Sequence, residues 1–214
     1  MTYPLAPWTL EGYAFLSVYL VDIDVSRSFI PSELEIISVW PGKTLGGVYF
    51  ANYQGGSVLE YNELIVVPAF VRYQEKVGSI ISHIYVDHQD SVSGGREIWG
   101  LPKELAQFTW DNQGVSISQN HRQLCHFRHQ KGFFNLSTGW RQQLSGESFG
   151  GLETDLLYFS STFKSHIGLV EGHLEIPPQS PFYQLKLSQP MLTLQLSQLS
   201  LMVNPPTIVG QKSI

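Results

Sequence analysis

The chain has 214 residues, of which 43% are hydrophobic and 14% are charged. This is enough for one well-buried core and short for two, so we predict a single domain over residues 1–214. Lys and Arg total 13 against 18 Asp and Glu, a net charge of −5 without a basic cluster, which argues against nucleic acid and anionic membranes as partners.

The cysteine content and the apolar runs indicate where the protein works. The single cysteine, Cys125, cannot form an intrachain disulfide. The N-terminus lacks the basic start and apolar core of a signal peptide, and runs such as Leu64 to Val71 are far shorter than the ~18 residues of a membrane span. We therefore expect a soluble, cytoplasmic protein in a reducing compartment.

The first half of the chain predicts strands with short connections. Tyr13 to Ile23 is rich in aromatic and β-branched residues, which favours a strand covered on both faces. Asp24 can cap a short helix from Val25 to Phe29, which Pro31 ends. Further strands are predicted over residues 34–39, 48–53, 63–73 (with an edge or bulge at Pro68) and 79–87. The connections are too short for helical crossovers, which indicates antiparallel pairing.

The second half continues the same pattern. The residues before Gly95 can form a short helix capped by Asp90. An extended stretch is predicted from Leu105 to Trp110. More strands are predicted over residues 115–118, 123–128, 133–136, 156–163, 167–176 and 182–187, with a Gln/Ser/Gly-rich loop over 140–151. Many short strands at close spacing indicate an all-β barrel or sandwich.

The last predicted strand contains a change of phase. Leucines alternate with polar residues from Leu192 to Leu196, and apolar residues alternate in the opposite phase from Leu199 to Val203. Because side chains on a strand have a period of two, one extra residue exchanges the two faces. The pattern predicts a β-bulge.

One lysine lies in unusually apolar sequence. Lys103 follows Pro102 within Gly94 to Ala106, a segment that also contains Ile, Trp, Leu and Ala. Burying an unpaired ammonium is costly, so apolar surroundings lower a lysine pKa from ~10.4 toward neutrality. A neutral amine condenses with a carbonyl to give a Schiff base. The alternative is an exposed lysine whose stem covers apolar surface.

The residues around this lysine form a longer motif. Gly-Arg-Glu-x-x-Gly-x-Pro-Lys-x-Leu, from Gly95 to Leu105, resembles the signature of the acetoacetate decarboxylase family, whose lysine is a standard example of an activated amine. Weaker similarity extends back to about Tyr13. Tyr61 to Leu64 resembles the family's Tyr-x-Glu segment, and Tyr85 and Asp87 stand at the expected distance before the Gly-Arg-Glu.

The resemblance implies a fold, a reaction and a set of site residues. The expected fold is a single-domain antiparallel β-barrel with one or two short helices, an internal ligand cavity and a homo-oligomeric assembly. Lys103 is expected to form the Schiff base without a cofactor or metal, and Glu63 to serve as acid/base or positioning group. Arg96 and Glu97 are expected to hold the loop that presents Lys103.

The chain departs from the family pattern at two positions. Glu104 stands where the family usually has a second lysine, and we expect it to face away from the site because neighbours on a strand point to opposite faces. Gly12 falls where decarboxylating members carry an arginine thought to hold the substrate carboxylate. A second acid expected near Val48 is also unmatched. Acetoacetate itself is therefore not the expected substrate.

Two other patterns have simpler explanations. Gly146 to Gly150 matches the Gly-x-Ser-x-Gly pattern of hydrolases, but it lies in a predicted polar loop rather than on a strand-to-helix elbow. Among seven histidines, His126 and His129 would point to opposite faces of one strand, so we expect surface or core histidines rather than metal ligands.

The predicted function is a Schiff-base-forming lyase that acts on a β-keto acid or related carbonyl compound through an imine on Lys103. The same lysine could carry out decarboxylation, aldol-type condensation or dehydration. Two alternatives remain: a non-catalytic barrel that binds a hydrophobic, carbonyl-containing or pigment-like small molecule, and a structural subunit without a ligand.

Overall fold

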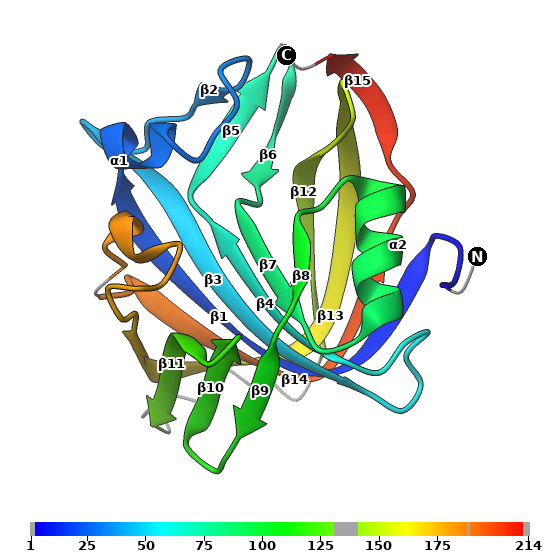
Figure 1. Ribbon diagram of the computed structural model, residues 1–214, viewed down its shortest axis with the longest axis vertical. Coiled ribbons are helices and arrows are strands. Elements are labelled where there is room, and N and C mark those ends of the chain that lie inside the picture. The colour runs from blue at the N-terminus through cyan, green and yellow to red at the C-terminus, as the bar shows by residue number, and fades with distance from the viewer. Residues whose placement is uncertain (1–2, 131–140, 188, 212–214) are drawn as a thin grey trace.

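The structure is a computed structural model that describes residues 3–130, 141–187 and 189–211. These described residues are mainly β, with two α-helices and one short 3₁₀ helix, η1 (Figure 1). The elements in chain order are β1 (Trp8–Asp22), α1 (Ile23–Arg27), β2 (Glu35–Ile36), β3 (Lys43–Gln54), β4 (Asn62–Val67), β5 (Ala69–Tyr73), β6 (Lys76–Ile80), β7 (His83–Val86), α2 (Gln89–Trp99), β8 (Lys103–Leu105), β9 (Gln107–Trp110), β10 (Gly114–Gln119), β11 (Arg122–Gln130), β12 (Gln142–Leu152), β13 (Asp155–Glu175), η1 (Tyr183–Leu185), β14 (Leu192–Val203) and β15 (Thr207–Gln211).

The strands form one strongly curved sheet that does not close. Its main path runs β2-β5-β6-β12-β13-β14-β1-β3-β4-β7-β8, and its end strands do not pair with each other. Most neighbours are antiparallel, as predicted, although β6 with β12 and β7 with β8 are parallel. The prediction of a closed barrel is therefore wrong, while the mainly β architecture is confirmed.

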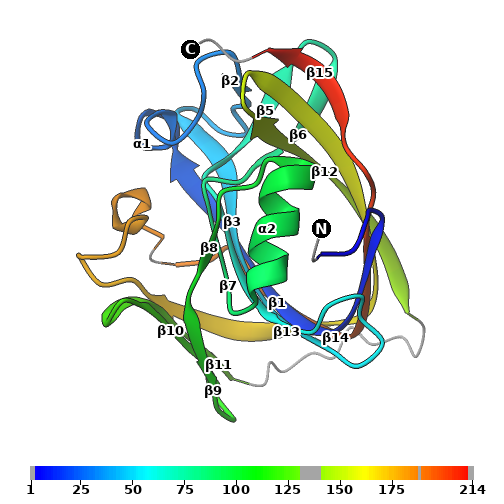
Figure 2. The same ribbon diagram turned by 45° about the vertical axis from the view of Figure 1, so that its right-hand side comes forward.

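Helix α2 packs inside the open, curved sheet. Figure 2 shows α2 lying within the curve of the sheet, where it packs against β7, β8 and β12. At the C-terminal end of α2, Gly100 has φ +63° and accepts a hydrogen bond from Gly151 N of β12 at 3.2 Å. A Cβ on Gly100 would lie 2.4 Å from a backbone atom of Gly151. A close contact between two glycines thus joins the C-terminal end of α2 to β12.

The central strand β1 is covered on both faces, as predicted. It pairs with β14 on one side and β3 on the other. Phe15 and Tyr19 enter the core of the outer face, whereas Leu10 and Ala14 enter the core of the inner face. The smaller sheet β9-β10-β11, which joins β13, and the segment that includes η1 supply side chains to the outer core.

The boundaries of several elements differ from the sequence prediction. The Gln/Ser/Gly-rich segment predicted as a loop is strand β12, because β13 satisfies its backbone hydrogen bonds along its whole length. Residues 182–187, predicted as a strand, contain η1 instead. The predicted strand 133–136 lies outside the described residues. The predicted bulge in β14 is confirmed: the pairing with β1 and β13 shifts by one residue there, and Gln198 has φ +49°.

Helix α2 is longer than predicted. It begins at Gln89, after His88, whose ring Nδ1 accepts a hydrogen bond from Asp90 N at 3.1 Å, and it continues through both glycines to Trp99. Within the described residues, no helix is both long and apolar enough to span a membrane.

Candidate active site

Lys103 begins β8 and points into the interior. Its side chain is 4% exposed. Its Nζ donates hydrogen bonds to Glu63 Oε1 at 2.8 Å and to Ser91 Oγ at 3.0 Å, and it lies 3.5 Å from Tyr61 OH. The aromatic ring of Tyr61 is 5.0 Å from Nζ, close enough to stabilise an ammonium through its π face. The partners of this amine therefore come from three segments: β4, α2 and the residues just before β4.

Two glycines of α2 make room for this arrangement. A Cβ on Gly95 would lie 2.4 Å from the Lys103 side chain, and a Cβ on Gly94 would lie 2.6 Å from the Trp8 ring. The lysine stem therefore crosses the helix at Gly95, where no Cβ blocks its approach to the backbone. This close approach explains why the motif has glycine at Gly95, inside a helix that glycine otherwise disfavours.

Glu63 is the acidic partner of the lysine. It is 4% exposed, and it lies on β4 between β3 and β7. Its Oε2 accepts a hydrogen bond from Tyr53 OH at 2.9 Å, and Tyr49 OH lies 3.3 Å from Tyr53 OH. Because Tyr53 gives its only proton to Glu63, Tyr49 must donate to Tyr53.

The tyrosines around Glu63 remain protonated. Burial raises the pKa of the Tyr53 and Tyr61 hydroxyls well above their usual value of 10, and the nearby Glu63 carboxylate raises the pKa of both further. Tyr53 therefore remains a hydrogen-bond donor to Glu63. Sequence reasoning missed Tyr53 and Ser91, because neither lies in the lysine motif as the family signature defines it.

The supporting residues of the motif have separate contacts. Arg96 Nε donates a hydrogen bond to the backbone oxygen of Lys103 at 2.7 Å. Glu97 accepts a hydrogen bond from Tyr3 OH, and among the described residues Arg96 forms no ion pair with it. Glu104 is exposed and accepts from Gln119 Nε2 at 2.8 Å. Arg96 is thus in place to position Lys103. The carboxylate of Glu104 lies away from the Lys103 amine, as expected for adjacent residues on a strand.

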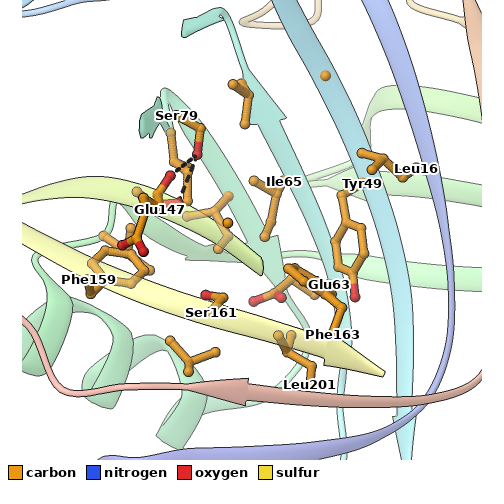
Figure 3. A pocket seen from close by; sticks show the side chains of 18 of the residues that line it. Leu16, Tyr49, Glu63, Ile65, Ser79, Glu147, Phe159, Ser161, Phe163 and Leu201 are labelled. Atoms are coloured by element: carbon orange, nitrogen blue, oxygen red, sulfur yellow. Dashed lines mark hydrogen bonds between the residues drawn. The ribbon is translucent and has the colours of Figure 1, made fainter. Parts of the chain in front are cut away.

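A pocket of about 460 Å³ lies on the concave face of the sheet beside the lysine, within the usual size range for drug-sized ligands. Figure 3 shows Glu63 and Tyr49 on one side, Ser79 and Glu147 on the other, and Ile65 between them. Phe70 and Leu144, which are 40% and 45% exposed, also line it. The wall is mostly apolar and includes Trp8, Leu10, Leu16, Trp99, Leu101, Phe159, Phe163, Leu196 and Leu201.

The pocket has little means to hold an anion. Among the described residues, its charged lining consists of Lys103, Glu63 and Glu147. Lys103 is already paired with Glu63, so no cation remains for a substrate carboxylate. Gly12 lies on β1, where a Cβ would be 2.0 Å from the backbone oxygen of Asn52. The backbone at this position therefore has no space for the arginine that the family pattern would place there.

The comparison with known families covers this same region. The family model described as acetoacetate decarboxylase matches residues 2–146, which include both Glu63 and Lys103. The chain belongs to the acetoacetate decarboxylase family. The resemblance inferred from the lysine motif is confirmed.

One relative matches the chain over about half of its length. Protein Neoxanthin-deficient 1 of Arabidopsis thaliana is 29% identical over 120 residues, which make up 56% of this chain and 42% of that protein. The match therefore covers less than half of the relative's length.

Solved structures of the family share the fold over nearly the whole chain. Acetoacetate decarboxylase from Legionella pneumophila has a TM-score of 0.77 at 17% identity, with 99% of this chain and 90% of that chain covered. The enduracididine biosynthesis enzyme MppR, complexed with the condensation product of pyruvate and imidazole 4-carboxaldehyde, has a TM-score of 0.65 at 14% identity, with 98% and 91% covered. At these identities the similarity establishes the fold.

Two sequence patterns do not form the sites that their motifs suggest. Gly146 to Gly150 lies in the middle of β12, so Ser148 is not on a strand-to-helix elbow. His126 and His129 lie on β11, and the described residues contain no group of His, Cys, Asp and Glu that could hold a metal ion. The Phe15 ring stacks on His129 with a centroid separation of 4.4 Å, which gives this histidine a packing role.

Proposed function

We propose that Lys103 forms a Schiff base with an apolar carbonyl compound, and that the protein is a carbon–carbon lyase or condensing enzyme of this family. The observation that supports this most directly is the buried Lys103–Glu63 pair at the wall of an apolar pocket. An amine held out of water next to a proton acceptor is the arrangement that imine formation needs.

Glu63 can carry the protons of this reaction. It first accepts one proton from the Lys103 ammonium, leaving a neutral amine that attacks the carbonyl carbon. The resulting carbinolamine loses its oxygen as water when the protonated Glu63 returns the proton. The iminium that remains is positively charged, and the Glu63 carboxylate, held by Tyr53, lies beside it. No cofactor is needed for these steps.

The iminium then determines which bonds can break. It withdraws electrons from a bond of the α carbon, the carbon next to the former carbonyl carbon. When that bond breaks, a proton, a carbon fragment or carbon dioxide leaves, and an enamine remains. The enamine can in turn add to a second carbonyl. The MppR complex with a condensation product supports this last possibility for the fold. The lack of a free cation in the described pocket lining favours condensation, cleavage or dehydration over decarboxylation.

A second candidate is a protein that binds the same compounds without reaction. The apolar wall of the pocket favours it, as does the relative whose name refers to neoxanthin rather than to an enzymatic activity. In that case the Lys103–Glu63 pair would polarise a ligand carbonyl through a hydrogen bond and no covalent bond would form.

Reductive trapping separates the two candidates. The protein is incubated with neutral ketones, aldehydes, β-keto acids and 2-oxo acids, reduced with borohydride and digested for mass spectrometry. A Schiff-base enzyme gives a mass gain equal to the carbonyl compound less its oxygen atom on the Lys103 peptide, with exposed Lys43 as the unmodified control. Tight binding measured by calorimetry without any adduct on Lys103 would establish the binding protein instead.

A further inference from the structure

The far side of the pocket carries a pair of hydroxyls that the proposed reaction does not use. Ser79 of β6 and Ser148 of β12 both line the pocket and are half-buried. Figure 3 shows Ser79 on the side opposite Glu63 and Tyr49. Ser148 is the central residue of the Gly-x-Ser-x-Gly pattern, so the segment that does not form a hydrolase elbow nevertheless contributes a polar group to the pocket.

These two hydroxyls are held together by the parallel pairing of β6 with β12. Ser79 and Ser148 occupy paired positions, and their Oγ atoms are 2.8 Å apart. Ser79 Oγ is also 3.3 Å from the backbone oxygen of Glu147. If Ser79 donates to Glu147, Ser148 donates to Ser79 and keeps a free lone pair. If Ser79 donates to Ser148, the Ser148 proton is free.

The serine pair can therefore either donate to a ligand or accept from it. A polar group that faces an apolar pocket without a partner loses its hydrogen bonds to water when a ligand enters. These hydroxyls therefore favour a ligand that brings a polar atom to this side.

The charges near the serines limit the kind of polar atom. The described lining contains no cation apart from Lys103, and the Glu147 backbone oxygen and its carboxylate are acceptors rather than donors. A carboxylate or phosphate there would meet negative potential and have no counter-ion. An alcohol is neutral and both donates and accepts, which matches the serine pair in either of its arrangements.

We propose that the pocket takes a hydroxylated apolar carbonyl compound, with its carbonyl at Lys103 and its hydroxyl at Ser79 and Ser148. The proposal rests on the proposed function for the carbonyl end, and independently on the serine pair for the hydroxyl end. It assigns β12 a role in substrate selection that is separate from the imine chemistry.

Three ketones that share one medium-length alkyl body test the proposal: the plain methyl ketone, the same ketone with a terminal hydroxyl, and the same ketone with a terminal carboxylate. Affinity is measured by calorimetry, and adduct formation on Lys103 by borohydride trapping. The hydroxyl form should bind about three- to tenfold more tightly than the plain ketone, the range expected for one neutral hydrogen bond. The carboxylate form should bind most weakly.

Variants then locate the preference. Ser79→Ala and Ser148→Ala should each lower the affinity for the hydroxyl form to about that for the plain ketone, so that the preference is lost. Ser200→Ala should retain it, because Ser200 is a half-buried serine of β14 outside the pocket lining.

Affinity and adduct formation test the hydroxyl site and the Schiff-base function separately. Equal affinity of the plain and hydroxyl ketones, or tightest binding of the carboxylate form, overturns the hydroxyl site even if Lys103 is trapped. A hydroxyl preference that depends on Ser148, without any adduct on Lys103, supports the hydroxyl site and overturns the Schiff-base function.

Discussion

The Lys103–Glu63 pair makes a quantitative prediction about stability. The two side chains are 4% and 5% exposed, and Nζ and Oε1 are 2.8 Å apart. At an effective dielectric constant of about 20, their attraction is about 6 kcal/mol, most of which offsets the desolvation of two charges. Removing one partner leaves the other charge buried and unpaired, so we expect Lys103→Met to lower the free energy of unfolding by about 3–5 kcal/mol.

A double-mutant cycle isolates the interaction. Glu63→Gln removes the charge and keeps an oxygen that can accept from Tyr53. In the double variant no charge is buried, so its free energy of unfolding should exceed that of Lys103→Met alone. The coupling energy should be at least about 2 kcal/mol, measured by urea denaturation with unchanged m-values.

An exposed pair provides the control. Lys43 and Asp22 are 2.6 Å apart, but their side chains are 36% and 54% exposed. The corresponding cycle, Lys43→Met with Asp22→Asn, should give a coupling energy below about 1 kcal/mol. If the Lys103 and Glu63 substitutions prove additive within about 0.5 kcal/mol, the two charges do not interact in the folded protein, and Glu63 loses its role as proton acceptor.

Three further variants test the packing around the site and the effect of pH. Gly95→Ala should slow borohydride trapping of Lys103 about a hundredfold, because its Cβ would lie 2.4 Å from the lysine stem. Ser93→Ala on the same helix should not slow it. Equal trapping rates in Gly95→Ala and the unaltered protein would contradict the packing argument. Gly12→Arg should lower the denaturation midpoint, since its Cβ would lie 2.0 Å from a backbone oxygen, and it should not confer turnover of a β-keto acid. A stable variant that turns over a β-keto acid would refute the argument that this position has no space for an arginine. Burial lowers the pKa of His83 below its usual 6.5, so the unfolded chain takes up this proton first, and stability should fall as pH drops below about 6.5. His83→Asn should flatten this dependence, measured by urea denaturation between about pH 7.5 and 5.5, and an unchanged slope would exclude His83 as its source.

Local sequence predicted the features that depend on neighbouring residues. The bulge in β14 follows from a phase change between Leu196 and Leu199, and the strand character of β1 follows from its aromatic and β-branched residues. The lysine motif identified both the family and the residue at the centre of the site. Each of these signals lies within about a dozen residues of sequence.

Composition was misleading where a distant partner decides the structure. The segment 142–152 is rich in Gln, Ser and Gly, which predicts a loop, but its backbone pairs with β13 and forms a strand. Similarly, Gly94 and Gly95 predict an early end to α2. The helix nevertheless continues through both glycines, whose small size is required because a larger residue would collide with Trp8 or with Lys103.

The sequence by itself determined the mainly β composition, the family and the lysine, because these depend on residue type and short-range spacing. Only the tertiary structure decided that the sheet stays open around α2, that Glu63 meets a lysine 40 residues away, and that Ser79 and Ser148 share one wall of the pocket. These contacts join strands whose register is set by the packing of the whole sheet, and no local pattern specifies which strands become neighbours.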